Sequence, residues 1–161
     1  MIRKVNNNDL AECVGVIKRS FLTVADEFGF TFENAPRFTA FATTIERLSW
    51  HLINEKRPMF VFAEDEKIIG YYSLALQTNH ECELNNLCVL PQFRHQKIGE
   101  KLLLHAFETA KNFGCTKINI GIVEENHRLR KWYEKYGFFH TGTKKFDFFP
   151  FTCGYMIYEL T

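Results

Sequence analysis

The chain has 161 residues and a formal net charge of +1 at pH 7, and 46% of its residues are hydrophobic and 16% aromatic. Such a length allows one domain with a substantial buried core, and the hydrophobic content excludes an intrinsically disordered chain. The near-neutral charge provides no basic field, which argues against nucleic acid and anionic membrane surfaces as partners.

The five cysteines and six histidines show no spacing that suits a metal ion or a disulfide framework. We therefore expect no metal site, and we expect free thiols in a reducing compartment. The N-terminus has no apolar signal core, and no apolar run reaches the length of about 18 residues that a membrane helix needs. A cytoplasmic location is the resulting expectation.

The first half of the chain mixes helical and strand patterns. In chain order, it predicts a strand over 2–5, a helix capped by Asn7 or Asn8 and ending near Phe21, an irregular Phe-rich segment over 21–38, a helix over 36–55, and a hairpin of strands over 58–63 and 67–77.

The second half has clearer periodicity. It predicts a strand over 81–90, an amphipathic helix over 97–113, a strand over 117–123, a helix over 126–136, and strands over 138–144 and 151–160. With no repeat or linker in the chain, we predict one α/β domain over residues 1–161, with a mixed central sheet and flanking helices.

The segment from Leu87 to Leu103 joins a buried-looking strand to an amphipathic helix through a short basic turn. The turn carries Arg94, His95, Gln96 and Lys97. A helix N-terminus that follows a strand presents unpaired backbone N–H groups and a positive dipole end. This arrangement predicts an anion site, and phosphate is its usual occupant.

Alternation along the strand over 81–90 separates two faces. One face would hold Cys82, Leu84, Asn86, Cys88 and Leu90, and the other Glu81, Glu83, Asn85, Leu87 and Val89. The second face is polar at one end and apolar near the turn, as expected of a strand that lines a partly open cleft. By this pattern alone, Glu83 is a solvated strand carboxylate paired with a lysine.

The helix over 126–136 carries an apolar face made by Leu129, Trp132, Tyr133 and Tyr136. By spacing alone, Tyr133 is a core residue. Asn126 stands where an N-cap is expected.

Two motifs resemble signatures of the GNAT superfamily of N-acetyltransferases. Arg94-x-x-Lys97-x-Gly99 is similar to its pyrophosphate loop, with Lys97 in place of one family glycine, and the stretch from Asn126 to Phe138 resembles its second signature. Their order and spacing match the family from Glu81 to Phe138. The resemblance implies a mixed sheet with splayed parallel central strands and acetyl-CoA as co-substrate.

The resemblance also implies a reaction and its residues. An acetyl group would pass to a primary amine by direct attack, with Glu83 as general base and Tyr133 as general acid. The coenzyme would be bound by Leu87, Cys88, Val89, Arg94, His95, Gln96, Lys97, Ile98, Gly99 and Asn126.

Some alternatives stay open. Lys97 leaves room for a non-catalytic module that binds acyl-CoA without turnover. The acceptor is a small-molecule or a peptide amine, and the carboxylates Asp26, Glu27 and Glu33 are candidates to attract it. The apolar tail 151–160 fits either a homodimer interface or burial in the core.

Overall fold

A computed structural model describes all residues from 1 to 161. The helices are α1 (Leu10–Phe28), α2 (Thr39–Ala42), α3 (Ile45–Ser49), α4 (Ile98–Asn112) and α5 (His127–Lys135), with short helical turns η1 (Asn7–Asp9), η2 (Trp50–Asn54) and η3 (Pro91–Phe93). The strands are β1 (Ile2–Lys4), β2 (Met59–Glu64), β3 (Lys67–Leu76), β4 (Glu81–Val89), β5 (Lys117–Val123), β6 (Phe139–Lys145) and β7 (Thr152–Glu159). None of the helices is both long and apolar enough to cross a membrane.

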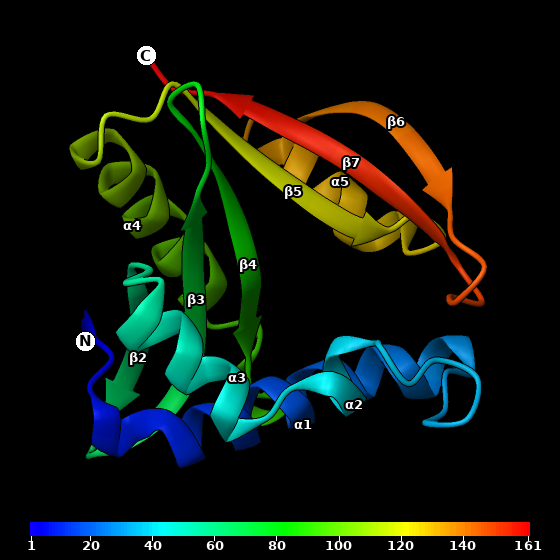
Figure 1. Ribbon diagram of the computed structural model, residues 1–161, viewed down its shortest axis with the longest axis horizontal. Helices are drawn as coiled ribbons and strands as arrows, with labels where there is room; N and C mark the ends of the chain where they lie inside the picture. The colour runs from blue at the N-terminus through cyan, green and yellow to red at the C-terminus, as the bar shows by residue number, and fades with distance from the viewer.

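The strands form one sheet of seven in the order β1-β2-β3-β4-β5-β7-β6. Every neighbouring pair is antiparallel except β4 and β5, which are parallel. These two strands pair only from Glu81–Lys117 to Glu83–Asn119 and then separate, as Figure 1 shows. The expected mixed sheet with splayed parallel central strands and flanking helices is therefore confirmed.

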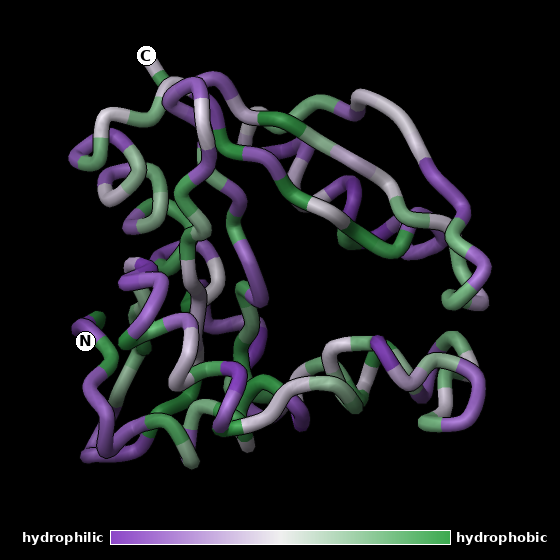
Figure 2. The backbone as a smooth tube through the Cα atoms, viewed as in Figure 1, coloured by the Kyte–Doolittle hydropathy of each residue, from purple (hydrophilic) through white to green (hydrophobic).

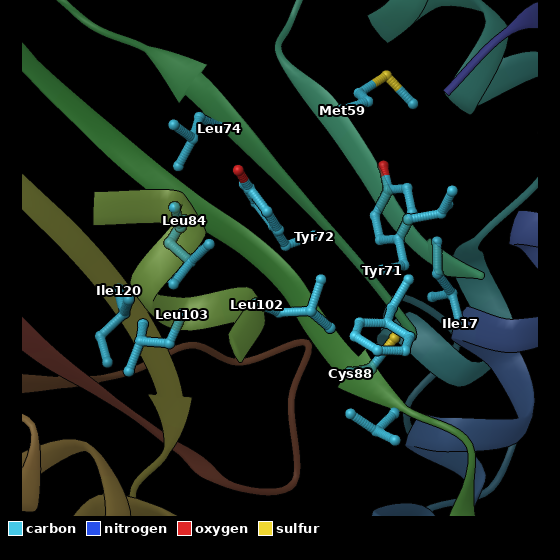
Figure 3. Close-up of a cluster of buried hydrophobic side chains, with 14 of the residues drawn as sticks. Ile17, Met59, Tyr71, Tyr72, Leu74, Leu84, Cys88, Leu102, Leu103 and Ile120 are labelled. Carbon is cyan, nitrogen blue, oxygen red and sulfur yellow. The ribbon is translucent and has the colours of Figure 1, made fainter. Parts of the chain in front are cut away.

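Helices cover both faces of the central strands. On one face the Tyr72 hydroxyl bonds His105 Nδ1 of α4 at 2.7 Å. On the other face, Tyr71 of β3 lies beside Cys88 of β4 and Ile17 of α1 (Figure 3). Figure 2 shows both hydrophobic and hydrophilic segments along β4 and β5, and beyond Glu83 the polar residues of β4 come together at Asn85 and Asn86. The largest core cluster holds 32 buried residues, and this close packing fixes the paired parts of the two strands before they diverge.

The first third of the chain differs from the prediction. Helix α1 continues past Phe21 to Phe28 and ends at Gly29, whose φ of +74° suits a glycine. The extra turns bury Ala25 in a second apolar cluster that contains Phe30, Phe38 and Phe151. The stretch 21–28, expected to be irregular, is therefore helical because this cluster packs against it.

The single helix expected over 36–55 is wrong. Thr43 is extended, with ψ of 127°, and separates α2 from α3. Its hydroxyl donates to the carbonyl of Thr39 at 2.7 Å, and the hydroxyl of Thr44 accepts from the Arg47 N–H at 3.1 Å. Such side-chain bonds to the backbone compete with a continuous helix and here divide it.

Strand β4 contains a bulge at Asn86 that the alternation pattern did not predict. Asn86 has φ of +55°, and the pairing with β3 shifts between Asn85 opposite Ser73 and Cys88 opposite Tyr71. A bulge adds one residue and reverses the faces that follow. Consequently Cys88 shares a face with Glu83, and the predicted grouping of Cys88 with Cys82 and Leu84 is wrong.

Candidate active site

A cavity of about 290 Å³ opens where β4 and β5 separate. Glu83 and Leu87 reach it from β4, and Tyr133 and Asn126 from α5 and its cap. Aromatic and aliphatic side chains from α1, the residue before α2 and the loop before β7 complete its wall, including Phe21, Val24, Phe38, Phe149 and Phe151. An apolar cavity with a few convergent polar groups is the usual form of a small-molecule site.

Glu83 accepts a hydrogen bond from the Asn85 side chain, with 2.5 Å between Nδ2 and Oε1. The carboxylate is half-buried and has no lysine or arginine within ion-pair distance. The alternative of a carboxylate paired with a lysine therefore does not describe this structure. Glu83 remains a free acceptor at the cavity wall.

Tyr133 is both a core residue and a cavity residue. Its ring packs edge-on against Trp132 and Phe138, with centroids 5.1 and 5.2 Å apart. Its hydroxyl has no hydrogen-bond partner in the protein, and the side chain lines the cavity. Burial raises the pKa of Tyr133 well above its usual value, so the hydroxyl keeps its proton at neutral pH.

Asn126 caps helix α5. Its Oδ1 accepts from the Leu129 N–H at 3.3 Å, which satisfies one free donor of the first turn. The residue is buried and lines the cavity, and its Nδ2 donates to no protein group. The side chain can therefore cap the helix with its oxygen while its nitrogen stays available to a ligand.

The edge of β4 that faces β5 is unpaired beyond Glu83. Leu87 lines the cavity there, but the side chains of Cys88 and Val89 do not. Cys88 is buried on the α1 side, where burial raises its thiol pKa to about 12. Only the backbone groups of Cys88 and Val89 could meet a ligand along this edge.

Arg94 ties the loop after β4 to helix α1. Its guanidinium donates to the Val89 carbonyl at 3.1 Å, to Thr23 Oγ1 at 3.0 Å and to the Ser20 carbonyl at 2.9 Å. Through these three bonds the guanidinium of Arg94 is hydrogen-bonded to groups of the protein itself. Arg94 therefore fixes the position of the loop, and its side chain is not directed outward as the anion-site prediction implied.

The next residues open helix α4 with free donors. None of the backbone N–H groups of residues 95–100 donates a hydrogen bond within the protein. His95, Gln96 and Lys97 are exposed, whereas the Ile98 side chain is buried and Gly99 lies against Trp132. His95 and Lys97 have φ of +66° and +63°. The loop thus presents a row of free N–H groups at a positive helix end.

Lys97 has the backbone conformation for which a glycine would be suited. It is the residue before the first turn of α4, with φ of +63° and no side-chain cap. Gly99, by contrast, lies inside the helix, and a Cβ there would be in ordinary contact with Trp132. Lys97 is therefore the residue of this turn whose Cβ is strained by a left-handed backbone conformation.

Several site residues were missed by sequence reasoning. Asn85, Asn86 and Arg37 line the cavity, although no motif marks them. The carboxylates of Asp26, Glu27 and Glu33 do not line it, and Glu27 pairs instead with Arg128 at 2.6 Å. No group of three or more His, Cys, Asp or Glu side chains is placed to hold a metal ion.

A splayed parallel pair, a cavity at the split and an open row of N–H groups together form the candidate site of this α/β domain. The acetyltransferase (GNAT) family model matches residues 21–138, which is most of the chain. The chain belongs to the acetyltransferase (GNAT) family.

Relatives and solved structures agree with this assignment. An uncharacterised N-acetyltransferase of Mycobacterium tuberculosis is 27% identical over 100 residues, which is 62% of this chain and 64% of that protein. The match thus spans less than two thirds of this relative's length. A spermidine N(1)-acetyltransferase of Thermoplasma acidophilum is 32% identical over 84 residues, 52% of each chain.

The fold likeness extends over the whole chain. The PaiA N-acetyltransferase of Thermoplasma acidophilum, solved in complex with coenzyme A, superposes with a TM-score of 0.83 at 21% identity and covers 99% of this chain and 98% of its own. The ribosomal-protein-S18-alanine N-acetyltransferase of Escherichia coli gives 0.78 at 14% identity, covering 100% and 94%. At such identities the likeness establishes the fold.

Proposed function

We propose that this protein transfers an acetyl group from acetyl-CoA to a primary amine. The observation that carries the proposal is the cavity at the split of β4 and β5, which has Glu83 and Tyr133 on its wall. Family membership supports it, as do relatives whose names describe acetylation of spermidine and of a ribosomal-protein alanine.

The coenzyme would bind in two parts. Its pyrophosphate would be held by the N–H groups of residues 95–100 at the N-terminus of α4, with the Lys97 ammonium close by. Its pantetheine arm would follow the unpaired edge of β4 and bond the main chain from Leu87 to Val89. The free Nδ2 of Asn126 would donate to a carbonyl of this arm.

The reaction would proceed by direct attack. The amine nitrogen forms a bond to the thioester carbonyl carbon, and the carbon–sulfur bond breaks. Glu83 takes the proton that the amine loses, and Tyr133 gives its proton to the departing thiolate. A backbone N–H near Leu87, beside the Asn86 bulge, stabilises the oxyanion because it is fixed where the charge develops.

Tyr133→Phe tests this assignment because it removes one oxygen and keeps the packed ring. We expect kcat for thiol release to fall by ~10²-fold or more, the effect of losing a general acid, while the Kd for acetyl-CoA stays the same. Tyr158→Phe, at a partly buried tyrosine outside the cavity, is the matched control. Unchanged turnover of Tyr133→Phe would remove Tyr133 from the mechanism.

A non-catalytic acyl-CoA-binding module is the other outcome of this assay. It would show as saturable binding of acetyl-CoA by the wild-type protein with no turnover on any amine.

A further inference from the structure

A second cavity of about 150 Å³ adjoins the first one. Its lining contains three arginines, Arg37, Arg47 and Arg57, and no carboxylate. Arg37, Asn85 and Asn86 line both cavities, so the two meet at the bulge of β4. We call this second space the basic cavity.

The positive charge of the basic cavity is only partly neutralised. Arg57 pairs with Glu55 at 2.8 Å, but Arg37 and Arg47 have no carboxylate within ion-pair distance. The guanidinium of Arg37 lies 4.2 Å above the ring of Phe148, which holds it in place. Two unpaired guanidinium groups at one cavity favour an anionic ligand.

The basic cavity is linked to the candidate general base by hydrogen bonds. Arg57 Nη1 donates to Asn85 Oδ1 at 3.3 Å, and Asn85 Nδ2 donates to Glu83 at 2.5 Å. A single carboxamide side chain thus separates a cation from the carboxylate that would receive the amine proton. An amine at Glu83 and an anion at Arg57 can therefore belong to one small molecule.

The coenzyme does not account for these charges. The row of N–H groups proposed for its pyrophosphate is formed by residues 95–100, and none of them lines the basic cavity. The basic cavity joins the first cavity at Asn85 and Asn86 of β4, next to Glu83, which would receive the amine proton. Its charge is also opposite to that required by a polycationic amine, because like charges repel.

We propose that the acceptor is a small amine that carries an anionic group, a carboxylate or a phosphoryl group, a few bonds from its nitrogen. The anion is held by Arg37, Arg47 and Arg57, and the amine faces Glu83. This inference rests on the proposed acetyl transfer and specifies its substrate class. Because the guanidiniums do not touch the reacting atoms, their contribution is to KM and to the choice of acceptor.

Matched acceptor pairs test the proposal in a thiol-release assay with acetyl-CoA. The pairs are glycine with glycinamide and O-phosphoethanolamine with ethanolamine, and spermidine is the cationic comparison. We expect kcat/KM to be at least about tenfold higher for the anionic member of one pair. A preference for glycine over glycinamide would indicate a carboxylate ligand, and a preference for O-phosphoethanolamine over ethanolamine would indicate a phosphoryl ligand.

Arg47→Gln is the decisive variant because Arg47 makes no side-chain bond that the fold would lose. It should raise KM for the anionic member by about tenfold, leave kcat nearly unchanged and leave the neutral member unaffected. Arg19→Gln, an exposed arginine of α1 that lines neither cavity, is the control and should change nothing.

The outcomes separate the two proposals. Equal turnover of both members of each pair, or faster turnover of spermidine, would overturn the acceptor inference and leave acetyl transfer standing. If no amine is acetylated, the proposal of acetyl transfer is overturned. The melting temperature of the protein with CoA and either glycine or O-phosphoethanolamine then tests whether the basic cavity binds an anion. A stabilisation of the wild type that Arg47→Gln loses would support an anion site there, and no stabilisation would overturn it.

Discussion

The carboxylate of Glu83 is held by the side chain of Asn85, two residues away on the same strand, at 2.5 Å. The bond fixes the carboxylate against the cavity wall just before the bulge at Asn86. Asn85 also accepts from Arg57, so its amide orientation is determined by both neighbours. A base that is oriented in this way has its proton-accepting oxygen in a defined place before the amine arrives.

Glu83→Gln tests this base. The glutamine oxygen can still accept from Asn85, so the geometry persists while the proton acceptor is lost. We expect kcat at neutral pH to fall by ~10²–10⁴-fold, the usual contribution of a general base. The part of the pH–rate profile that reports ionisation of the base should disappear, and only the dependence due to the amine itself should remain.

Glu81→Gln is the matched control, since Glu81 is on the same strand and lines neither cavity. Its rate and pH profile should equal those of the wild type. An unaltered profile for Glu83→Gln would leave Glu83 with a structural role only.

Lys97 contributes a charge and a strained backbone, and two variants separate them. Lys97→Ala and Lys97→Gly both remove the ammonium, so both should bind CoA more weakly and with less dependence on salt. Only the glycine variant relieves the left-handed φ of +63°. Its free energy of unfolding should exceed that of the alanine variant by up to ~1 kcal/mol. Wild-type affinity in both variants would show that Lys97 does not contact phosphate.

Asn126 combines a cap and a proposed ligand contact. Asn126→Ala should lower the free energy of unfolding by about 1 kcal/mol, because the cap to the Leu129 N–H is lost. Asn126→Asp keeps a capping oxygen but cannot donate to a carbonyl. It should therefore keep its stability in thermal unfolding and lose affinity for acetyl-CoA in calorimetry. If the aspartate variant binds like the wild type, Asn126 is only a cap.

The elements around the site were predictable where local pattern and tertiary packing agree. Ile118, Ile120 and Ile122 alternate in the sequence and are all buried, so β5 has the bounds that the pattern gives. Helix α5 likewise has its apolar face and its cap at Asn126 as expected. In these segments the local sequence preferences and the tertiary packing favour the same secondary structure.

Other features depend on contacts that the sequence pattern does not contain. The positive φ of Asn86 and the faces of β4 beyond it follow from pairing with β3, which periodicity cannot show. The division of α2 from α3 depends on the hydroxyls of Thr43 and Thr44. The guanidinium of Arg94 bonds α1, far away in the sequence, so a motif position alone could not reveal its partner.

The basic cavity is the clearest case of a site that is absent from the sequence pattern. Arg37 and Arg47 lie in the segment 36–55, which was expected to be one helix, and Arg57 follows that segment. The break at Thr43 separates α2 from α3, Arg57 follows the end of η2, and the three side chains line one cavity only in the folded chain. A near-neutral overall charge conceals such a local excess of one sign.

The most direct test of acetyl transfer is the mass balance of a single reaction. Wild-type protein is incubated with acetyl-CoA and the acceptor panel, and free thiol and N-acetylated amine are quantified in the same samples by colorimetry and mass spectrometry. We expect equal molar amounts of thiol and acetylated amine, accumulating only when both enzyme and amine are present. Saturable binding of acetyl-CoA without any N-acetylated product, or thiol release that is independent of the amine, would contradict this expectation.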